Sequence, residues 1–223
     1  GGTYLSGSVL EGWYAKNLRS EGRGLSTWQA DEIVEFLQTG RTARSAAFGS
    51  MADVVAHSTQ HMTRTDLRAI ADYLKQLPAR PGQPATWQPK EDTTTAALRG
   101  GDYGVPGAVL YTEHCTACHR ADGKGAPRVF PALAGNSIVY AEDASSLIQI
   151  TLAGGSMPKT PHDRMAFTMP GFAHLNDQEL ADISTFIRNS WGNHASAVTA
   201  KDIARMRKEI GHKPEHHVPE VQP

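Results

Sequence analysis

The chain has 223 residues, enough for two small domains, and it carries 22 Lys and Arg against 23 Asp and Glu. The resulting formal charge of −1 excludes a general electrostatic attraction to nucleic acid. The longest apolar runs fall far short of the roughly 20 residues that a membrane-spanning helix needs.

The first part of the chain predicts two helices. Ser26 to Gln29 resembles a capping box and marks the first start. Thr63 with Asp66 marks the second, and Pro78 ends that helix. The predicted inward faces are Ile33, Phe36 and Leu37 in the first helix, and Leu67, Ile70, Leu74 and Leu77 in the second.

Three further helices are predicted in the second part. One precedes Cys115, one spans residues 145–153, and one begins at a cap formed by Asn176 and Glu179. Their predicted inward faces are Ala108, Tyr111 and Cys115 in the first, Leu147 and Ile150 in the second, and Leu180, Ile183, Ile187 and Trp191 in the third.

Four prolines between residues 78 and 90 predict a semi-rigid linker, placed at residues 80–98. It separates a first domain, residues 1–79, from a second, residues 99–195. Residues 196–223 are expected to form a short amphipathic helix and a disordered tail. With strong helix signals and poor strand signals, we expect an all-α fold.

The two domains share an internal repeat. Residues 61–67 align with residues 174–180 at a shift of 113, and residues 33–40 align with residues 147–154 at a shift of 114. Two helices in the same order at nearly the same offset indicate a duplicated domain, of which the N-terminal copy begins partway through.

The motif Cys115-Thr116-Ala117-Cys118-His119 is the attachment signature of c-type haem. Two thiols three positions apart can each form a thioether with one vinyl group of the haem, and the histidine that follows can bind the iron. A thiol redox pair would favour a βαβ context, which the pattern does not predict. A structural zinc site would need a second pair of ligands, and none stands at a suitable spacing.

The surroundings of the motif resemble the class I cytochrome c family. Gly107 and Tyr111 precede it, and the loop Pro131-Ala132-Leu133-Ala134-Gly135 follows it. The resemblance implies that Tyr111, Pro131 and Leu133 contribute to haem binding. It also implies that the Pro131 carbonyl accepts a hydrogen bond from the His119 ring, which would orient this axial ligand.

The distal axial ligand is expected from the segment before the last helix of that domain. Met169 stands in Met169-Pro170-Gly171-Phe172, which is the position that the family uses. Met157 is an alternative, and Met165 is expected to serve packing. His162 and His174 keep open a histidine or a water in place of methionine.

A wider resemblance covers residues 10–195. The segments Trp13–Asn17, Gly49–Met51 and Arg188–Asn193 resemble the three-haem cytochrome subunits of bacterial membrane-bound dehydrogenases for alcohols, aldehydes, sugars and sugar acids, and of related molybdenum hydroxylases. By this resemblance Met51 is the axial ligand of a second haem, if a preceding part of the protein supplies the attachment motif.

The chain departs from that family because it has one Cys-x-x-Cys-His motif rather than three. Either a preceding segment carries the other motifs, or the first lobe is a relic without haem. We favour the first account, because a lobe folded around a missing cofactor would hold a costly void.

The resemblance implies electron transfer, with one covalently bound haem c in this chain and more if the full protein is longer. With both axial positions filled by protein, no site is open for substrate chemistry, so the chain is expected not to be an enzyme itself. The expected partners are the catalytic subunit of a dehydrogenase and a quinone or another cytochrome as acceptor, with a possible peripheral membrane contact. The expected location is the periplasm, at the outer face of the bacterial inner membrane. The alternatives are a haem peroxidase-like enzyme, a freestanding soluble electron shuttle and a thiol redox protein.

Overall fold

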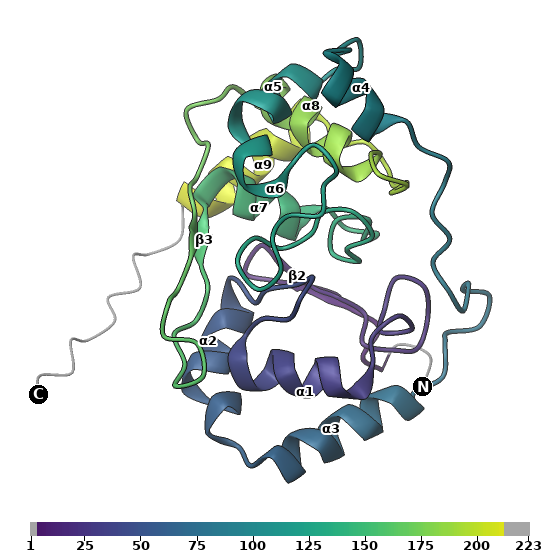
Figure 1. Cartoon of the computed structure of the whole chain (residues 1–223), viewed down its shortest axis with the longest axis vertical. Coiled ribbons are helices and arrows are strands. Elements are labelled where there is room, and N and C mark those ends of the chain that lie inside the picture. Colours follow the sequence, from purple (N-terminus) through teal and green to yellow (C-terminus); the bar gives the residue numbers. More distant parts are fainter. Residues whose placement is uncertain (1–3, 212–223) are drawn as a thin grey trace, which may run out of the picture.

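A computed structural model describes residues 4–211 and arranges them in two lobes joined by an extended segment (Figure 1). The first lobe, residues 4–79, comprises β1 (Ser8–Leu10), β2 (Trp13–Ala15), α1 (Ala30–Thr39), α2 (Ser50–His57), the 3-10 helix η1 (Thr59–His61) and α3 (Arg64–Gln76). The second lobe, residues 94–211, comprises α4 (Thr94–Gly100), α5 (Ala108–His114), α6 (Thr116–His119), α7 (Ser145–Ala153), β3 (Gly155–Ser156), β4 (Thr168–Met169), α8 (Asp177–Arg188) and α9 (Ala200–Gly211).

The fold is mostly helical, but the all-α prediction missed two short antiparallel hairpins. β1 pairs with β2, and β3 pairs with β4 in the register Gly155 to Met169 and Ser156 to Thr168. These strands are two or three residues long, too short for the alternation of apolar and polar residues that identifies a strand in a sequence.

Local capping explains where the helices begin. Thr63 accepts a hydrogen bond from the backbone of Asp66 at the start of α3, and Asn176 forms a capping box with Glu179 at the start of α8, both as predicted. The capping box of α1 is formed by Gln29 with Glu32, so the predicted start at Ser26 is three residues too early.

Each lobe has its own apolar core. In the first lobe the core is centred on α1 and α3 and contains Leu25, Trp28, Ile33, Val34, Leu67 and Ala71. In the second lobe α5 crosses α8 at Gly107, where an added Cβ would lie 2.3 Å from the carbonyl oxygen of Asp182. Only glycine permits this backbone-to-backbone approach at a φ of +85°. The backbones of α5 and α8 are therefore in direct contact at this crossing.

The repeat is visible in the order of the elements. α1 and α3 pack together in the first lobe as α7 and α8 do in the second, and α1 and α7 end at Gly40 and Gly154, which both have positive φ. The division into two independent domains stays a prediction, because contacts join the lobes. α7 packs on α8, α9 and also β2 of the first lobe, and the hydroxyl of Ser146 bonds to both the N–H and the carbonyl of Tyr14, at 2.8 and 3.1 Å.

The segment between the lobes packs against the second lobe. The ring of Trp87 stacks on Tyr140 with centroids 4.9 Å apart, and the N–H of Lys90 donates to the carbonyl of Gly192 at 3.1 Å. α4 begins at Thr94, inside the predicted 80–98 linker, where the Asp92 carboxylate accepts the N–H of Thr94. The last proline of the linker is Pro89, so nothing prevents a helix from starting there.

The C-terminal helix is present as α9, while the predicted disordered tail falls on residues 212–223, outside the described part of the chain. Between residues 4 and 211 no helix combines the length and the apolar character needed to cross a bilayer.

Candidate functional site

The two cysteines lie at the junction of α5 and α6. The N–H groups of Cys118 and His119 both donate to the carbonyl of Cys115, at 3.2 and 2.9 Å, which forms a tight turn. Both thiols are free, Cys115 buried and Cys118 half-buried. Burial, and then the neighbouring Cys118, raise the pKa of Cys115 to about 12. A reactive redox thiol needs a lowered pKa, so this environment disfavours thiol redox chemistry.

His119 is buried at the end of α6, and its Nδ1 lies 3.0 Å from the carbonyl oxygen of Pro131. Since a carbonyl can only accept, Nδ1 carries the proton and the lone pair of Nε2 is available to a metal. Burial lowers the pKa of His119, and the hydrogen bond to Pro131 opposes this shift. The contact that the resemblance implies is present, and it leaves a neutral, oriented imidazole.

A compact loop brings Pro131 to His119. The N–H of Gly125 donates to the carbonyl of His119 at 3.1 Å, and the N–H of Leu133 donates to the carbonyl of Gly123 at 2.7 Å. At Gly125 an added Cβ would lie 2.1 Å from the carbonyl oxygen of Phe130, at a φ of +60°. The path of this loop therefore depends on a glycine at position 125.

Tyr111 and Leu133 lie in the same apolar core as Cys115. The Tyr111 hydroxyl donates to the carbonyl of Arg120 at 2.8 Å, and burial raises the pKa of Tyr111 well above its usual range. The Tyr111 ring contacts that of Trp191, with centroids 5.1 Å apart. These residues brace the turn that carries the motif, and their role in binding haem stays a prediction.

The stretch Arg188–Asn193 braces this site from the end of α8, a role that the sequence analysis did not assign. Trp191 donates from Nε1 to the carbonyl of Ala121 at 2.9 Å. Asn193 donates to the carbonyl of Leu133 and accepts the N–H of Gly135, both at 3.0 Å. Its sequence resembles a family motif and places Trp191 on an inward helix face, but it predicts no contact with the loop after the motif.

Of the three methionines in the described hairpin region, Met169 packs against the apolar core that contains Cys115, Tyr111 and Leu133. Met157 is half-buried, and its N–H donates to the carbonyl of Phe167 at 3.0 Å. The expectation that Met165 serves packing is wrong, because its side chain is 68% exposed.

The two histidine alternatives, His162 and His174, are exposed. The positions favour Met169 as the distal ligand, which stays a prediction.

Met51 is half-buried in the first turn of α2, beside Gly49. An added Cβ at Gly49 would lie 2.5 Å from the Trp13 ring, so the tryptophan packs directly beneath this turn. The two methionines lie on different kinds of element, since Met51 is in α2 and Met169 is in β4. Its role as a second axial ligand stays a prediction that depends on a haem held by residues outside this sequence.

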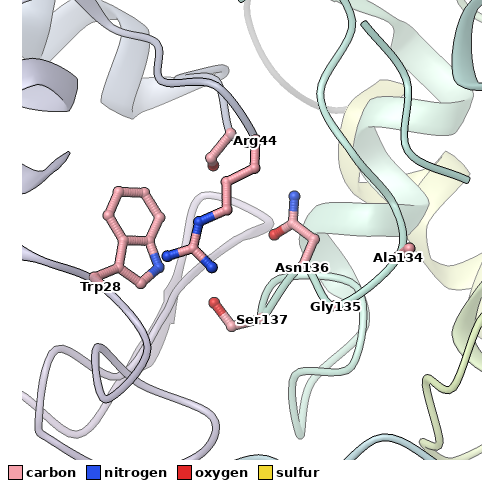
Figure 2. A pocket seen from close by; sticks show the side chains of 7 residues that line it. Trp28, Arg44, Ala134, Gly135, Asn136 and Ser137 are labelled. Carbon is pink, nitrogen blue, oxygen red and sulfur yellow. The ribbon is translucent and has the colours of Figure 1, made fainter. Parts of the chain in front are cut away.

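The first lobe also reaches the loop after the motif. Figure 2 shows Trp28 and Arg44 of the first lobe facing Asn136 and Ser137 across a small pocket. The ammonium of Lys16 donates to the Ser137 hydroxyl and lies 5.1 Å from the centre of the Trp28 ring. Burial, and then the charge of Arg44, lower the pKa of Lys16 to about 7.

The donor set fits a covalently bound haem. Two thiols three positions apart, an imidazole with Nε2 available and a thioether on the same core are the ligands that a c-type haem uses. Residues 105–191 match the cytochrome c family model. These residues form a cytochrome c domain.

The similarity of this chain to known proteins extends well beyond residues 105–191. It is 46% identical over 211 residues to the cytochrome c subunit of an alcohol dehydrogenase (quinone) of Gluconobacter oxydans (strain 621H), an alignment that covers 93% of this chain and 44% of the relative. It is 45% identical over 212 residues to the gluconate 2-dehydrogenase cytochrome c subunit of Pantoea cypripedii, covering 92% and 48%. It is 27% identical over 224 residues to the fructose dehydrogenase cytochrome subunit of Gluconobacter japonicus, covering 92% and 46%.

The predicted resemblance to dehydrogenase cytochrome subunits is thus confirmed. These relatives are named as cytochrome subunits, the electron-transfer components of dehydrogenase complexes, and not as catalytic subunits. The chain spans less than half the length of each of them.

Proposed function

We propose that this chain transfers electrons within a dehydrogenase complex through one haem c attached to Cys115 and Cys118. The observation that carries the proposal is the geometry of His119. His119 directly follows Cys118 in the chain. Its Nδ1 lies 3.0 Å from the Pro131 carbonyl, and this contact fixes the tautomer of the ring. The identity of 46% to a dehydrogenase cytochrome c subunit supports the same role.

Four side chains would hold the haem. The thiols of Cys115 and Cys118 would form the two thioethers, and His119 and Met169 would bind the iron through a nitrogen and a sulfur. Bound in this way, the haem supplies a one-electron couple of iron. With His119 and Met169 both bound to the iron, the chain would bind no substrate there, and its partner would carry out the dehydrogenation.

The partner is the catalytic subunit of a dehydrogenase, and the electrons pass on to a quinone or to another cytochrome. We place the protein in the periplasm, at the outer face of the bacterial inner membrane, with a peripheral membrane contact. The motif at residues 115–119 supports this location, because bacteria attach haem c in the periplasm. Cell fractionation tests it, and a haem-bearing product confined to the cytoplasm contradicts it.

Haem attachment is tested on protein matured in a bacterial periplasm. The intact mass after denaturation should equal the polypeptide with one haem, and alkylation should find no free thiol. In Cys118→Ala, the pyridine haemochrome spectrum should shift to that of a haem with a single thioether. Free thiols in the mature protein, or loss of haem on denaturation, would overturn the proposal.

The distal ligand is tested with Met169→Ala. The ferric protein should lose the weak near-infrared absorption band of a methionine-bound haem, and its reduction potential should fall because a harder ligand replaces sulfur. Met157→Ala and Met165→Ala serve as matched controls and should keep the band. If Met169→Ala keeps it, the sulfur comes from another residue. If the wild-type protein lacks the band and binds peroxide, a peroxidase-like site replaces the electron-transfer proposal.

A further inference from the structure

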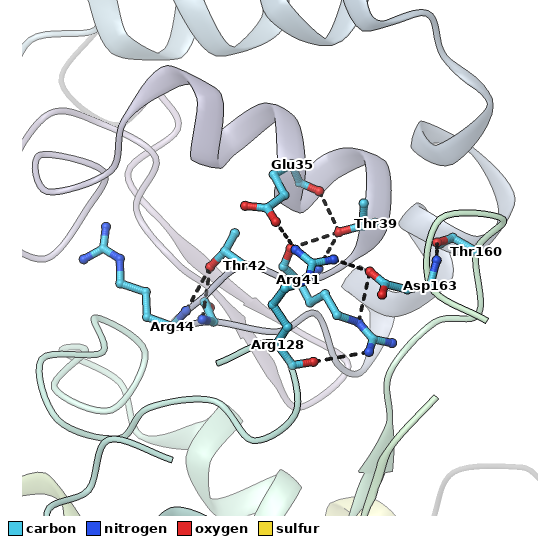
Figure 3. Close-up of polar contacts among 9 residues, drawn as sticks. Glu35, Thr39, Arg41, Thr42, Arg44, Arg128, Thr160 and Asp163 are labelled. Atoms are coloured by element: carbon cyan, nitrogen blue, oxygen red, sulfur yellow. Dashed lines mark hydrogen bonds and ion pairs between the residues drawn. The ribbon is translucent and has the colours of Figure 1, made fainter. Parts of the chain in front are cut away.

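Arg41 extends from the end of α1 in the first lobe into the second lobe (Figure 3). Its side chain is only 3% exposed. Nη2 donates to the carbonyl of Met165 at 2.7 Å, and Nη1 donates to the carbonyl of Arg128 at 3.2 Å. Nε lies 3.7 Å from the carboxylate of Asp163. One buried cation therefore contacts two separate loops of the second lobe.

One of these loops carries Met169, the expected distal ligand, and the other carries Pro131, which orients the expected proximal ligand His119. Met165 stands four residues before Met169, in the hairpin that β3 and β4 close. Arg128 stands three residues before Pro131, whose carbonyl orients His119. A single side chain of the first lobe thus fixes the distal and the proximal loop relative to each other.

Arg128 and Asp163 complete a paired network around Arg41. The Arg128 guanidinium forms ion pairs with Glu35 of α1 and with Asp163 of the hairpin. The backbone N–H of Asp163 donates to the hydroxyl of Thr160 at 3.1 Å. Two cations face two carboxylates, so removing Asp163 would leave the buried Arg41 guanidinium without a carboxylate, which is costly.

Apolar contacts seat the hairpin on the first lobe. An added Cβ at Gly40 would lie 2.3 Å from Cγ of Pro158, so the proline lies directly on the end of α1. The Arg41 guanidinium lies 5.8 Å from the centre of the Phe167 ring, and Phe167 meets Phe130 edge to face at 6.0 Å. The hairpin therefore follows the position of the first lobe.

Within its own lobe the hairpin is held at its base and by a few contacts with one loop. Its paired strands are two residues each, and hydrogen bonds join the N–H of Met157 to the carbonyl of Phe167 and the hydroxyls of Ser156 and Thr168. Its outer part contacts the loop that carries Arg128 and Phe130. The segment between β3 and β4 is much longer than the two paired positions that close it, so it retains conformational freedom. The contacts with Arg41 remove that freedom from the side of the first lobe.

We propose that Arg41 is a positioning residue for Met169, and that through it the first lobe controls ligation at the haem of the second lobe. This inference rests on the proposed function, in which Met169 binds the iron. When the Arg41 contacts are lost, the hairpin moves more freely and external ligands displace Met169 more easily.

The test measures displacement of Met169 by imidazole in the ferric, periplasmically matured protein. Arg41→Met should raise the apparent affinity for imidazole about tenfold, within the usual range of coupling between sites. Arg41→Lys restores a charge but cannot reach both carbonyls and the carboxylate. Its apparent affinity for imidazole should therefore lie between those of the wild-type protein and Arg41→Met. Arg68→Met is the matched control, since Arg68 is a half-exposed arginine of the same lobe paired with Asp31 and Asp72. It should leave the affinity unchanged.

A double variant separates positioning from a general loss of structure. If Arg41 acts through Met169, adding Arg41→Met to Met169→Ala should not change imidazole affinity further. Asp163→Asn weakens the same network without removing Arg41, and it keeps the test available if Arg41→Met does not fold. Wild-type affinity in both Arg41→Met and Asp163→Asn, or an equal effect with and without Met169, overturns the inference. The pyridine haemochrome assay of the same samples reports on the proposed function separately, because absence of covalent haem contradicts that function first.

Discussion

Asn193 offers a quantitative test of how the end of α8 supports the site. Its side chain is 3% exposed and makes three hydrogen bonds. Nδ2 donates to the carbonyls of Leu133 and Ile187 at 3.0 and 3.2 Å, and Oδ1 accepts the N–H of Gly135 at 3.0 Å. Asn193→Ala removes all three, so the N–H of Gly135 loses its partner and the carbonyl of Leu133 keeps only the N–H of Asn136.

A buried hydrogen bond contributes about 1 kcal/mol net, and an abandoned buried partner costs somewhat more, so we expect a loss of about 3 kcal/mol in the free energy of unfolding. With a urea dependence of about 2–3 kcal/mol per M, the midpoint of unfolding should fall by about 1 M. Urea titration of the haem-bearing protein, followed by far-ultraviolet circular dichroism, measures this midpoint.

Asn189→Ala is the matched control, because Asn189 is exposed at the end of the same helix and makes two hydrogen bonds. Its loss should cost under about 1 kcal/mol, since water replaces the partners. Asn193→Asp keeps the acceptor for Gly135 but turns a buried carboxylate oxygen toward two carbonyl oxygens, so it should lose at least as much stability as Asn193→Ala. Equal midpoints for Asn193→Ala and Asn189→Ala would refute the reasoning.

Three further predictions concern stability. Because burial lowers the pKa of Lys16 from 10.5 to about 7, the unfolded state binds the extra proton between those values, and stability should rise with pH by at most ~1.4 kcal/mol per pH unit. Urea titrations at several pH values measure this rise. It should be absent in Lys16→Met and present in the exposed control Lys201→Met. A rise that persists in Lys16→Met would contradict the lowered pKa of Lys16 as its cause. Gly107→Ala should cost far more than Gly82→Ala, because both have positive φ but only the first brings a Cβ to 2.3 Å from a carbonyl oxygen. Similar melting temperatures for the two glycine variants would contradict the close helix crossing. Tyr111→Phe should cost about 1 kcal/mol, since it removes one buried hydrogen bond of 2.8 Å and keeps the ring, and an unchanged urea midpoint would show that this bond contributes nothing.

The features that the sequence predicted well depend on neighbours within a few positions. The starts of α3 and α8 follow from side chains that bond to backbone three residues away. The start of α1 was misplaced because two overlapping segments both resemble a capping box, and Glu32 also pairs with Arg44, a contact that local sequence does not reveal. The attachment motif was found because haem chemistry fixes its spacing.

The features that the sequence missed depend on distant partners. Arg41 is 87 positions from Arg128 and 124 from Met165, and no local pattern marks either contact. Asn193 bonds to Leu133 across 60 positions. The resemblance to a family indicated the loop at Pro131 and the late Met169, whereas the contacts between lobes appeared only once the chain was folded.

α7 is buried between the two halves of the repeat and contacts both of them. The prediction gave this helix one inward face, yet the structure buries Ser146, Leu147, Ile148, Gln149, Thr151 and Leu152. α7 belongs to the second lobe and also contacts β2 of the first lobe. Separating the lobes after a break in the linker would therefore expose apolar surface and break the hydrogen bond from Ser146 to Tyr14. The molecule should therefore melt in a single cooperative step, and a fragment holding only the attachment motif should melt earlier and aggregate. Two separate melting transitions would show instead that the two halves fold independently.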